Sequence, residues 1–256
     1  MLTDMSSSRD QFNKQARLYA TSPVHRFGPS LAVLVELAAP DPSDVVLDVA
    51  TGTGNTALTL APQVLRVIGL DVASAMLEQA RARAQEDKIA NAEFVSGSAE
   101  ELPFSDAEFS LVVSRHAPHH FHHLDKFLRE VRRVLKPGGR LVVADQISPS
   151  AQVAEWVDRW EQTRDPSHFR QRTITEWREL TAAAGFSWIQ DQSVVYELLF
   201  DWWVKQAGCE EKTVQQLQQL AEKADELVRR EMGIKLSPSG EVLSFGEPML
   251  VVRLGR

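Results

Sequence analysis

Hydrophobic and polar positions follow two rhythms along the first half of the chain. Short apolar runs rich in Val, Ile and Leu, each next to turn-forming residues, predict buried strands at five places: 45–50, 66–71, 92–97, 109–114 and 140–145. Between most of these runs the apolar residues recur at helical spacing, most clearly over 74–85 and 124–135. Strands that alternate with helices favour a parallel β-sheet that is covered by helices on both faces.

The rhythm changes after Asp145. Two further helices are predicted over 151–162 and 175–186, with Thr175 as the N-cap of the second helix and Gly185 at its C-terminal end. A long strand, a helix and a last strand are expected over 188–200, 212–233 and 248–254. Because the helices interrupt the strand rhythm, they indicate a lid rather than a separate domain.

Composition narrows the class of protein. A chain of 256 residues with 43% hydrophobic and 25% charged residues is typical of one globular α/β domain, and no apolar run approaches the roughly 20 residues that span a bilayer. The net charge of -7 disfavours nonspecific binding to nucleic acid. The first residues do not resemble a signal peptide, and the single cysteine, Cys209, excludes an internal disulfide. We therefore expect a cytoplasmic protein without integral membrane association, whose partner is a small molecule.

A glycine-containing loop follows the first predicted strand. Gly52 and Gly54 let the backbone turn tightly and let a ligand lie close to the next helix N-terminus. Asp71 ends the second predicted strand, where a carboxylate can accept hydrogen bonds from both hydroxyls of a ribose. The predicted ligand therefore contains a nucleoside.

Charge separates two nucleoside cofactors. Asp48 ends the first predicted strand, and no Lys or Arg occurs between it and Gln63. A carboxylate there is poorly matched to the pyrophosphate of NAD and well matched to an ammonium or sulfonium group. S-adenosylmethionine is thus favoured, while an NAD-dependent oxidoreductase stays an alternative. A non-catalytic protein that binds S-adenosylmethionine and acts as a regulator is a second alternative, because a fold does not fix its chemistry.

Four motifs carry a family resemblance. VLDVATGTGNTAL, GLDVASAML, GSAEELPF and FLREVRRVLKPGGRLVVAD occur in this order and resemble class I S-adenosylmethionine-dependent methyltransferases, in particular the group of the ubiquinone/menaquinone biosynthesis C-methyltransferases. The resemblance is strong over about 12–145 and extends more weakly through TRDPSHFR and WRELTAAAGF. It implies a Rossmann-like α/β fold with a seven-stranded, mostly parallel sheet, an antiparallel last strand and helical lid elements. It also implies S-adenosyl-L-methionine as cofactor and S-adenosyl-L-homocysteine as product.

The resemblance also implies roles for individual cofactor-binding residues. Gly52 and Gly54 would approach the methionine portion, and Asp48 would lie near its ammonium group. Asp71 would hold the ribose, and Met76 would lie against the adenine.

Four more positions complete the predicted cofactor site. The family often has an acidic residue where this chain has Ser98, which can still accept a hydrogen bond, and Ala99 can offer its backbone N–H to the adenine. Tyr19 resembles a position at which the family folds a helix over the cofactor. Arg115, at the end of the fourth predicted strand, is a further candidate.

The stretch HAPHHFHH holds five of the seven histidines. A zinc site is disfavoured, because neither H-E-x-x-H nor C-x-x-C accompanies the cluster. The stretch follows the fourth predicted strand, whose carboxyl end borders the ligand crevice of an open sheet, so His116, His119 and His120 are the residues able to face a substrate. We predict that His119 or His120 orients or deprotonates a phenol, enol or similar acceptor, with Asp145 and His168 as further candidates.

The acceptor is the least determined part. Six tryptophans in the second half favour a hydrophobic or aromatic small molecule methylated at carbon or oxygen, yet the sequence does not separate a phenol from a small amine or a natural-product intermediate. It also leaves the oligomeric state open. We expect one methyltransferase domain over 1–256, with an N-terminal helical cover (1–40), a cofactor-binding core (41–147), and lid helices with the final strands (148–256).

Overall fold

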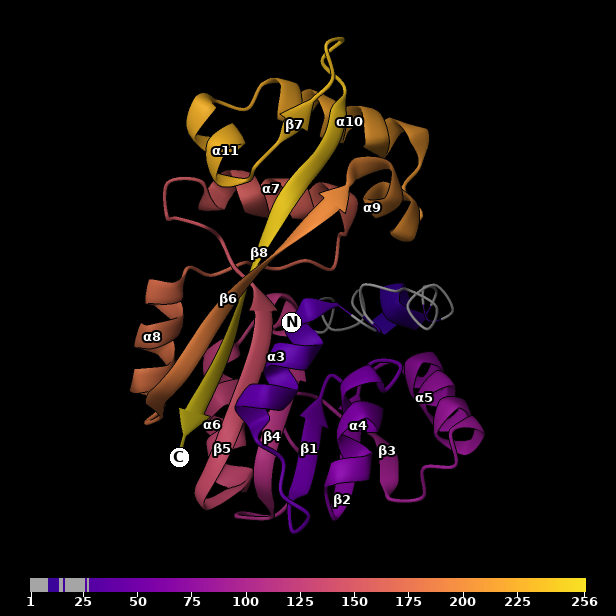
Figure 1. Cartoon of the computed structure of the whole chain (residues 1–256), viewed down its shortest axis with the longest axis vertical. Helices are drawn as coiled ribbons and strands as arrows, with labels where there is room; N and C mark the ends of the chain where they lie inside the picture. The colour runs from indigo at the N-terminus through magenta and orange to yellow at the C-terminus, as the bar shows by residue number, and fades with distance from the viewer. Residues whose placement is uncertain (1–8, 14–15, 17–25, 27) are drawn as a thin grey trace.

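The computed structural model describes residues 9–13, 16, 26 and 28–256. Within these residues eight strands form one sheet in the order β3-β2-β1-β4-β5-β8-β6, and the short β7 pairs with β8 outside this order (Figure 1). The strands are β1 (Val45–Val49), β2 (Arg66–Asp71), β3 (Ala92–Ser96), β4 (Phe109–Arg115), β5 (Leu135–Gln146), β6 (Ser187–Leu199), β7 (Lys235–Leu236) and β8 (Val242–Gly255).

Helices flank the sheet and build a second lobe at one end of it (Figure 1). Over 28–256 they are α3 (Pro29–Ala38), α4 (Asn55–Leu60), the 3-10 turn η1 (Ala61–Gln63), α5 (Ser74–Glu86), the 3-10 turn η2 (Pro118–His120), α6 (Leu124–Val134), α7 (Ala154–Arg164), α8 (Ile174–Ala183), α9 (Phe200–Gln206), α10 (Glu211–Glu222) and α11 (Glu226–Glu231). None of the helices in the described part of the chain is long and apolar enough to cross a membrane.

The strand directions confirm the predicted fold class. β1 pairs in parallel with β2 and β4, β2 with β3, and β4 with β5. β8 runs antiparallel to both β5 and β6. Because the strand order reverses between β1 and β4, a crevice opens at their carboxyl ends, which is where open α/β sheets bind ligands.

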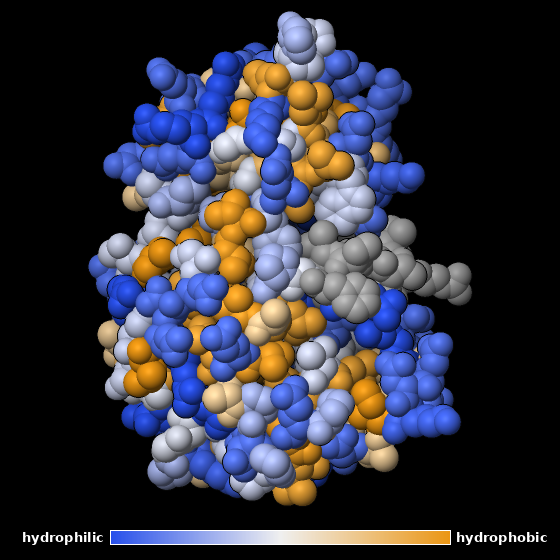
Figure 2. Space-filling model, in the orientation of Figure 1, coloured by the Kyte–Doolittle hydropathy of each residue, from blue (hydrophilic) through white to orange (hydrophobic). Residues whose placement is uncertain are grey.

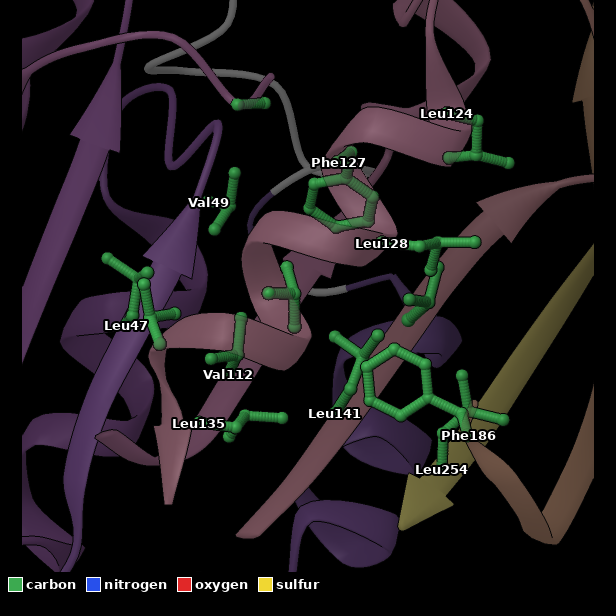
Figure 3. Packing of buried hydrophobic residues seen from close by; sticks show 14 of the residues in the cluster. Leu47, Val49, Val112, Leu124, Phe127, Leu128, Leu135, Leu141, Phe186 and Leu254 are labelled. Atoms are coloured by element: carbon green, nitrogen blue, oxygen red, sulfur yellow. The ribbon is translucent and has the colours of Figure 1, made fainter. Parts of the chain in front are cut away.

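Two apolar layers hold helices against opposite faces of the sheet. Successive strand residues point to opposite faces, so Leu47 belongs to the cluster under α6, whereas Val46 belongs to the cluster under α3 and α4. Phe127 and Leu128 of α6 are fully buried in the first cluster (Figure 3). Burial of one such side chain stabilises the fold by about 1.5–3 kcal/mol.

The lobe formed by α7, α9, α10 and α11 has a core of its own. The rings of Trp160 and Trp203 are stacked with centroids 5.1 Å apart, and Phe245 packs edge-on against Trp203 at 4.8 Å. β6 and β8 extend from the parallel part of the sheet into this lobe (Figure 1). The apolar faces of the lobe helices therefore pack on the far ends of the two long strands.

The edge strand β6 leaves apolar side chains exposed. Val195 and Leu199 are each 65% exposed. On the face drawn in Figure 2, hydrophobic residues form patches along the long axis of the molecule, interspersed with hydrophilic ones.

The structure corrects three sequence-based boundaries. Thr173, not Thr175, is the N-cap of α8, because its side chain and that of Glu176 form a reciprocal capping box. The helix predicted over 212–233 is two helices, and Asp225 caps the second by accepting from Val228 N. The last strand is longer than predicted, because its first half pairs with β6 and β7 in the second lobe.

Candidate active site

A large cavity, here called the main cavity, opens at the carboxyl ends of β1, β2 and β4. Its volume is about 150 Å³. It is lined by Phe12, Asp48, Ala50, Thr51, Gly52, Thr53, Asn55, Thr56, Leu70, Asp71, Val72, Met76, Gly97, Ser98, Ala99, Glu100, Arg115, His116, Ala117, His120, Phe121 and His122. Most of the predicted cofactor residues therefore lie around one space.

The two predicted glycines have different tasks. Gly52 lines the main cavity at φ +54°, and its N–H donates to Asp71 Oδ2 at 2.8 Å. Gly54 is not among the lining residues, and its approach to a ligand stays a prediction. It begins α4 at φ +79°, and a Cβ atom there would lie 3.1 Å from the side chain of Ala80. Gly54 thus serves the turn and the helix packing.

Asp71 is held by the backbone around it. Its Oδ1 accepts from Ala73 N at 2.9 Å, and its Oδ2 accepts from Gly52 N. Each oxygen still has acceptor capacity, because a carboxylate oxygen can take two hydrogen bonds. Burial raises the pKa of Asp71 despite these bonds, and the carboxylate is 7% exposed. Its fixed orientation suits two neighbouring hydroxyl donors.

Asp48 and Arg115 bring opposite charges into the main cavity. Asp48 accepts from Thr51 Oγ1 at 2.6 Å and from Ala57 N at 3.1 Å, and burial raises its pKa to about 7. The guanidinium of Arg115 donates to Thr56 at 3.3 Å and to Ser30 at 3.2 Å. A zwitterionic amino-acid group needs both a cation and an anion, and the main cavity supplies both.

The far end of the main cavity is less polar. Met76 and Ala99 are 3% and 8% exposed, and the Oγ of Ser98 accepts from Glu100 N at 3.1 Å. Glu100, which was not among the predicted site residues, also lines this cavity. Its Oε1 accepts from His123 N at 2.9 Å. An acidic residue one turn after a strand-end glycine was the available signal.

The predicted Tyr19 lies outside the described residues. Phe12 is described and lines the main cavity, with its ring 5.0 Å from that of His120. The N-terminal segment therefore does contribute an aromatic ring to this cavity. That ring comes from a residue that the sequence analysis did not select.

A smaller cavity, here called the histidine chamber, adjoins the main cavity. Its volume is about 30 Å³, room for about two water molecules. It is lined by His116, His119, His120, Gln146, Glu161, Arg164, Asp165 and His168. Because His116 and His120 line both cavities, they mark the boundary between them.

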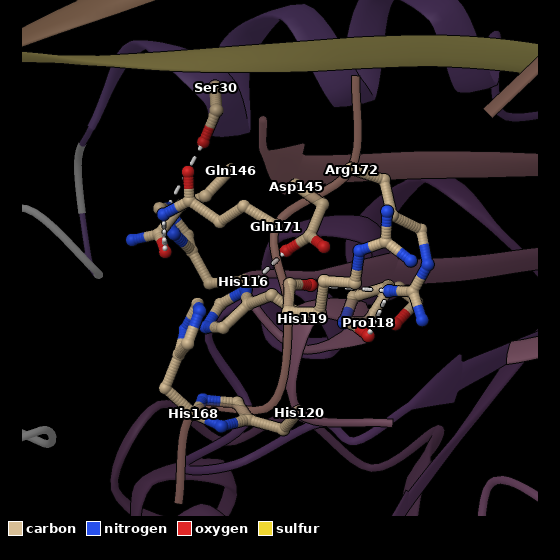
Figure 4. A network of polar contacts seen from close by, with 12 residues as sticks. Ser30, His116, Pro118, His119, His120, Asp145, Gln146, His168, Gln171 and Arg172 are labelled. Carbon is tan, nitrogen blue, oxygen red and sulfur yellow. Dashed lines mark hydrogen bonds and ion pairs between the residues drawn. The ribbon is translucent and has the colours of Figure 1, made fainter. Parts of the chain in front are cut away.

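His119 forms a buried pair with Asp145. Its Nδ1 lies 2.7 Å from Asp145 Oδ1, and the two side chains are 7% and 2% exposed (Figure 4). Burial lowers the pKa of His119 well below its usual range and raises the pKa of Asp145 to about 7. We assign a single proton to the pair, on Nδ1, where it is donated to the carboxylate. The Nε2 of His119 then carries a lone pair and makes no hydrogen bond within the described part of the chain.

The orientation of His120 is set by a backbone carbonyl. Its Nδ1 lies 2.9 Å from the carbonyl oxygen of Ser167, and a carbonyl only accepts, so Nδ1 carries the proton. Burial, reinforced by His119, lowers the pKa of His120 to about 3. At neutral pH this ring is uncharged, and its Nε2 is an acceptor.

The chamber wall comes from a segment far along the chain. His168 Nε2 lies 2.9 Å from Asp158 Oδ1, and its ring stacks on that of His119 at 5.6 Å. The carbonyl oxygen of His119 accepts from the N–H groups of both Phe169 and Arg170. These backbone bonds join the loop after α7 to the loop after β4 and bring His168, a predicted candidate, beside His119.

Backbone strain occurs at both strand ends that face the cavities. Ala50 and His116, just after β1 and β4, have φ values of +56° and +52°. Residues with a side chain rarely adopt this conformation, and it concentrates at functional sites. No sequence signal marks either position, because the strain arises from the surrounding packing.

Two other expectations concern residues outside these walls. Among the residues that the structure describes, no three His, Cys, Asp or Glu side chains converge as a metal-binding set. None of the six tryptophans, all of which are described, lines the main cavity or the histidine chamber.

Comparisons with known proteins agree with this geometry. A family model described as a methyltransferase domain matches residues 47–143. An uncharacterised methyltransferase, YcgJ of Bacillus subtilis, is 34% identical over 91% of this chain and 93% of its own length. Ubiquinone/menaquinone biosynthesis C-methyltransferase UbiE of Brucella anthropi is 35% identical over 59% of this chain and 62% of its length.

Solved structures extend the likeness to the whole fold. The crystal structure of YcgJ superposes with a TM-score of 0.86 at 33% identity and covers 89% of this chain and 97% of that chain. A putative methyltransferase from Bacillus halodurans gives a TM-score of 0.85 at 30% identity over 88% of this chain and 97% of its own.

Proposed function

The chain belongs to the S-adenosylmethionine-dependent methyltransferases, and from this premise we propose that it methylates a small molecule whose reacting atom enters the histidine chamber. S-adenosyl-L-methionine is the cofactor of the family, and when bound it supplies a methyl group carried on a sulfonium. The observation that carries the proposal is the buried His119–Asp145 pair, in a chamber that shares His116 and His120 with the main cavity.

The main cavity fits this cofactor by its donor set. Asp71, with both oxygens fixed by backbone N–H groups, would hold the ribose hydroxyls. Asp48 would face the ammonium group and Arg115 the carboxylate of the methionine portion. Met76 and Ala99 would lie against the adenine, with Ser98 as a nearby acceptor. Burial raises the pKa of a carboxylate, whereas a cation beside it stabilises the charged form.

His119 is the proposed general base. Its Nε2 would take the proton that the reacting atom of the acceptor loses, and Asp145 would stabilise the imidazolium that forms. Both side chains are almost completely buried, so their interaction acts in a low dielectric. A positioned general base accelerates such a step by about 10²–10⁴-fold. His120, with Nε2 as an acceptor, would orient the same atom.

The acceptor itself stays a prediction. The expected hydrophobic or aromatic molecule, methylated at carbon or oxygen, was inferred from the tryptophans, and the tryptophans of the second lobe pack with one another instead. The proposal therefore rests on chemistry and not on acceptor shape. The reacting atom must bear a proton that an imidazole can remove. A cytoplasmic setting, argued from the single cysteine, also stays a prediction.

A labelled-methyl screen tests the proposal. The protein is incubated with methyl-labelled S-adenosylmethionine and fractionated metabolite extract, and labelled products are identified by mass and by the methylated atom. We expect turnover that falls at least about a hundredfold in His119→Asn, as expected for loss of a general base. The exposed His123→Asn serves as matched control and should retain activity.

Three outcomes would contradict parts of the proposal. Unchanged methylation in both His119→Asn and His120→Asn would remove the histidine mechanism. Tight binding of S-adenosylhomocysteine without turnover on any fraction would favour the regulatory alternative. Binding of NAD in a titration, with no effect of S-adenosylhomocysteine, would favour an oxidoreductase.

A further inference from the structure

The histidine rings of the histidine chamber present hydrogen-bond acceptors to the space between them. Asp145 holds Nδ1 of His119, the Ser167 carbonyl holds Nδ1 of His120, and Asp158 holds Nε2 of His168. Burial lowers the pKa of both His119 and His120, so in these two uncharged rings the held Nδ1 is the donor and Nε2 is an acceptor. Neither Nε2 atom has a hydrogen-bond partner in the described part of the chain. All three rings line the same chamber.

Acidic side chains add further acceptors to the chamber wall. Glu161 and Asp165 both line it and are 3% and 5% exposed. Asp165 accepts from both the N–H and the hydroxyl of Ser167, and these bonds together with the charge of Arg164 hold the pKa of Asp165 below its usual range despite burial. Burial raises the pKa of Glu161, while the charge of Arg164 beside it favours the ionised form. The wall therefore combines acidic side chains with lone pairs.

The cation that lines the chamber is already engaged. Arg164 Nε lies 3.7 Å from Glu161 Oε2, and its guanidinium carbon lies 4.6 Å from the ring centroid of Trp203. Behind the wall, Glu247 adds another buried carboxyl group, which accepts from Gln146 Nε2 at 2.6 Å. Arg164 thus faces two lining acids, and the layer behind them holds a third acid, Glu247, and a second buried cation, Arg172, whose charge acts on Asp145.

We propose that the histidine chamber receives a protonated amino group and that the reaction is the N-methylation of a small amine. This inference rests on the proposed function, because it assumes that the methyl acceptor binds in the histidine chamber. An ammonium group has three N–H donors and one positive charge, which match the Nε2 acceptors of His119 and His120 and the carboxylate of Asp165. A hydroxyl has one donor and no charge. A metal ion would need converging ligands, and no such set occurs among the described residues.

The volume of the chamber restricts how the amine binds. Space of about 30 Å³ holds the amino group and its first carbon, so the rest of the molecule must lie beyond His116 and His120, on the side of the main cavity. The amine is therefore primary or bears one small substituent. This arrangement places the nitrogen at the boundary that the two cavities share.

The reaction balances with the groups present. The ammonium nitrogen gives one proton to an imidazole nitrogen, His119 Nε2 being the best supported by its carboxylate partner. The freed lone pair forms the N–C bond to the transferred methyl group as the S–C bond breaks, and the electron pair of that bond stays on sulfur. The products are a methylated ammonium ion and the thioether S-adenosylhomocysteine, and the proton passes from the imidazole to solvent.

A binding comparison tests the assignment without requiring turnover. The full chain is saturated with S-adenosylhomocysteine and titrated by calorimetry with two pairs of equal shape, benzylamine with benzyl alcohol and n-butylamine with 1-butanol. We expect each amine to bind at least about tenfold more tightly than its alcohol, the ratio that 1.4 kcal/mol of electrostatic interaction gives. Equal binding within each pair, or preference for the alcohols, would overturn the proposal. Zinc or magnesium ions that compete with the amines would overturn it in favour of a metal site.

A matched pair of variants locates the effect. Glu161→Gln removes one chamber charge and should abolish the preference for amines, while Glu155→Gln makes the same change at an exposed position of the same helix and should keep it. Because the wild-type comparison needs no variant, it stands even where Glu161→Gln does not fold. Asp165→Asn, which removes the charge of the other acidic lining residue, then serves as the second variant.

The labelled-methyl assay separates this inference from the proposed function. Methyl label on nitrogen of an amine supports both. Label on a phenol oxygen or a carbon, with amines ignored, overturns the amine assignment and leaves the proposed function intact. Tight amine binding without methylation of any acceptor supports the chamber assignment and contradicts the proposed function.

Discussion

The main cavity and the histidine chamber are built in different ways. In the main cavity the carboxylate of Asp71 is fixed by backbone N–H groups of Gly52 and Ala73, all from segments that end two neighbouring strands. In the chamber His119 and His168 are fixed by other side chains, Asp145 and Asp158, and the residues come from several elements. The proposed cofactor site thus relies on backbone geometry, whereas the proposed acceptor site relies on side chains that can change without altering the sheet.

The largest expected effect separates binding from catalysis. Asp145→Asn keeps the shape of the His119 partner but removes its charge, so the imidazolium that forms on proton transfer loses its stabilisation. We expect turnover to fall by about 10²–10⁴-fold, while the Kd of S-adenosylhomocysteine stays within about threefold, since Asp145 is not among the residues lining the main cavity. Rate assays and calorimetry measure the two quantities.

The control for this variant is Asp87→Asn, an exposed change after α5. If Asp145→Asn weakened cofactor binding as much as it slowed turnover, the two cavities would not act as separate units. The comparison between them would then fail.

The next effect tests whether the tryptophans of the second lobe are structural. Trp160 is 1% exposed, and its ring packs against Trp156, Trp203 and Phe245. Trp160→Ala should cost about 3–5 kcal/mol of unfolding free energy, measured by urea denaturation. The half-buried Trp202→Ala should cost less.

An aromatic acceptor pocket would give a different result. Trp160→Ala would then raise KM for the acceptor while the urea midpoint hardly moved. Such an outcome would shift acceptor recognition from the histidine chamber to the second lobe.

A smaller effect concerns the main cavity alone. Asp71→Ala removes the proposed ribose acceptors and also leaves the N–H groups of Gly52 and Ala73 without their partner. We expect binding of S-adenosylhomocysteine to weaken about a hundredfold, the loss of roughly two hydrogen bonds to a charged group. Calorimetry measures it, with Asp87→Ala as the exposed control. A Kd within threefold of wild type would show that Asp71 supports the loop and not the ligand.

The same contrast explains what the sequence could predict. The strands, the parallel order and the placement of Asp48, Gly52 and Asp71 around one cavity follow from local periodicity and from strand ends that meet at one edge of the sheet. The helix cap at Thr173 was missed because two threonines compete at nearby positions, and the choice depends on Glu176 three residues later.

The chamber was only partly predictable. His119 and His120 were identified by their position after the fourth strand, but Glu161 and Asp165 were not, since α7 has no local feature that shows which of its polar residues face inward. Their place depends on the contact between the loop after α7 and the His119 carbonyl, which joins residues about fifty positions apart. Such contacts arise only from tertiary packing.

The smallest effect probes the acidic layer behind the chamber. Burial, reinforced by Glu161, raises the pKa of Glu247 to about 8, well above the usual value for a glutamate. The folded protein thus keeps this proton between about pH 4.5 and 8 while the unfolded chain releases it, so the wild type loses stability as pH rises through this window. Glu247→Gln does not titrate and still accepts from Gln146. We expect the two proteins to have equal Tm near pH 5. By pH 8 the free energy of unfolding of the variant should exceed that of the wild type by on the order of 1–2 kcal/mol, which corresponds to several degrees in Tm.

Glu241→Gln is the matched control, because Glu241 is exposed in the turn before β8. Its stability should follow the wild type at every pH. Melting curves of Glu247→Gln that stay parallel to the wild type from pH 5 to pH 8 would mean that Glu247 is ionised in the folded protein. The negative charge behind the chamber would then be larger than we infer, and amine selectivity would survive the loss of Glu161 alone.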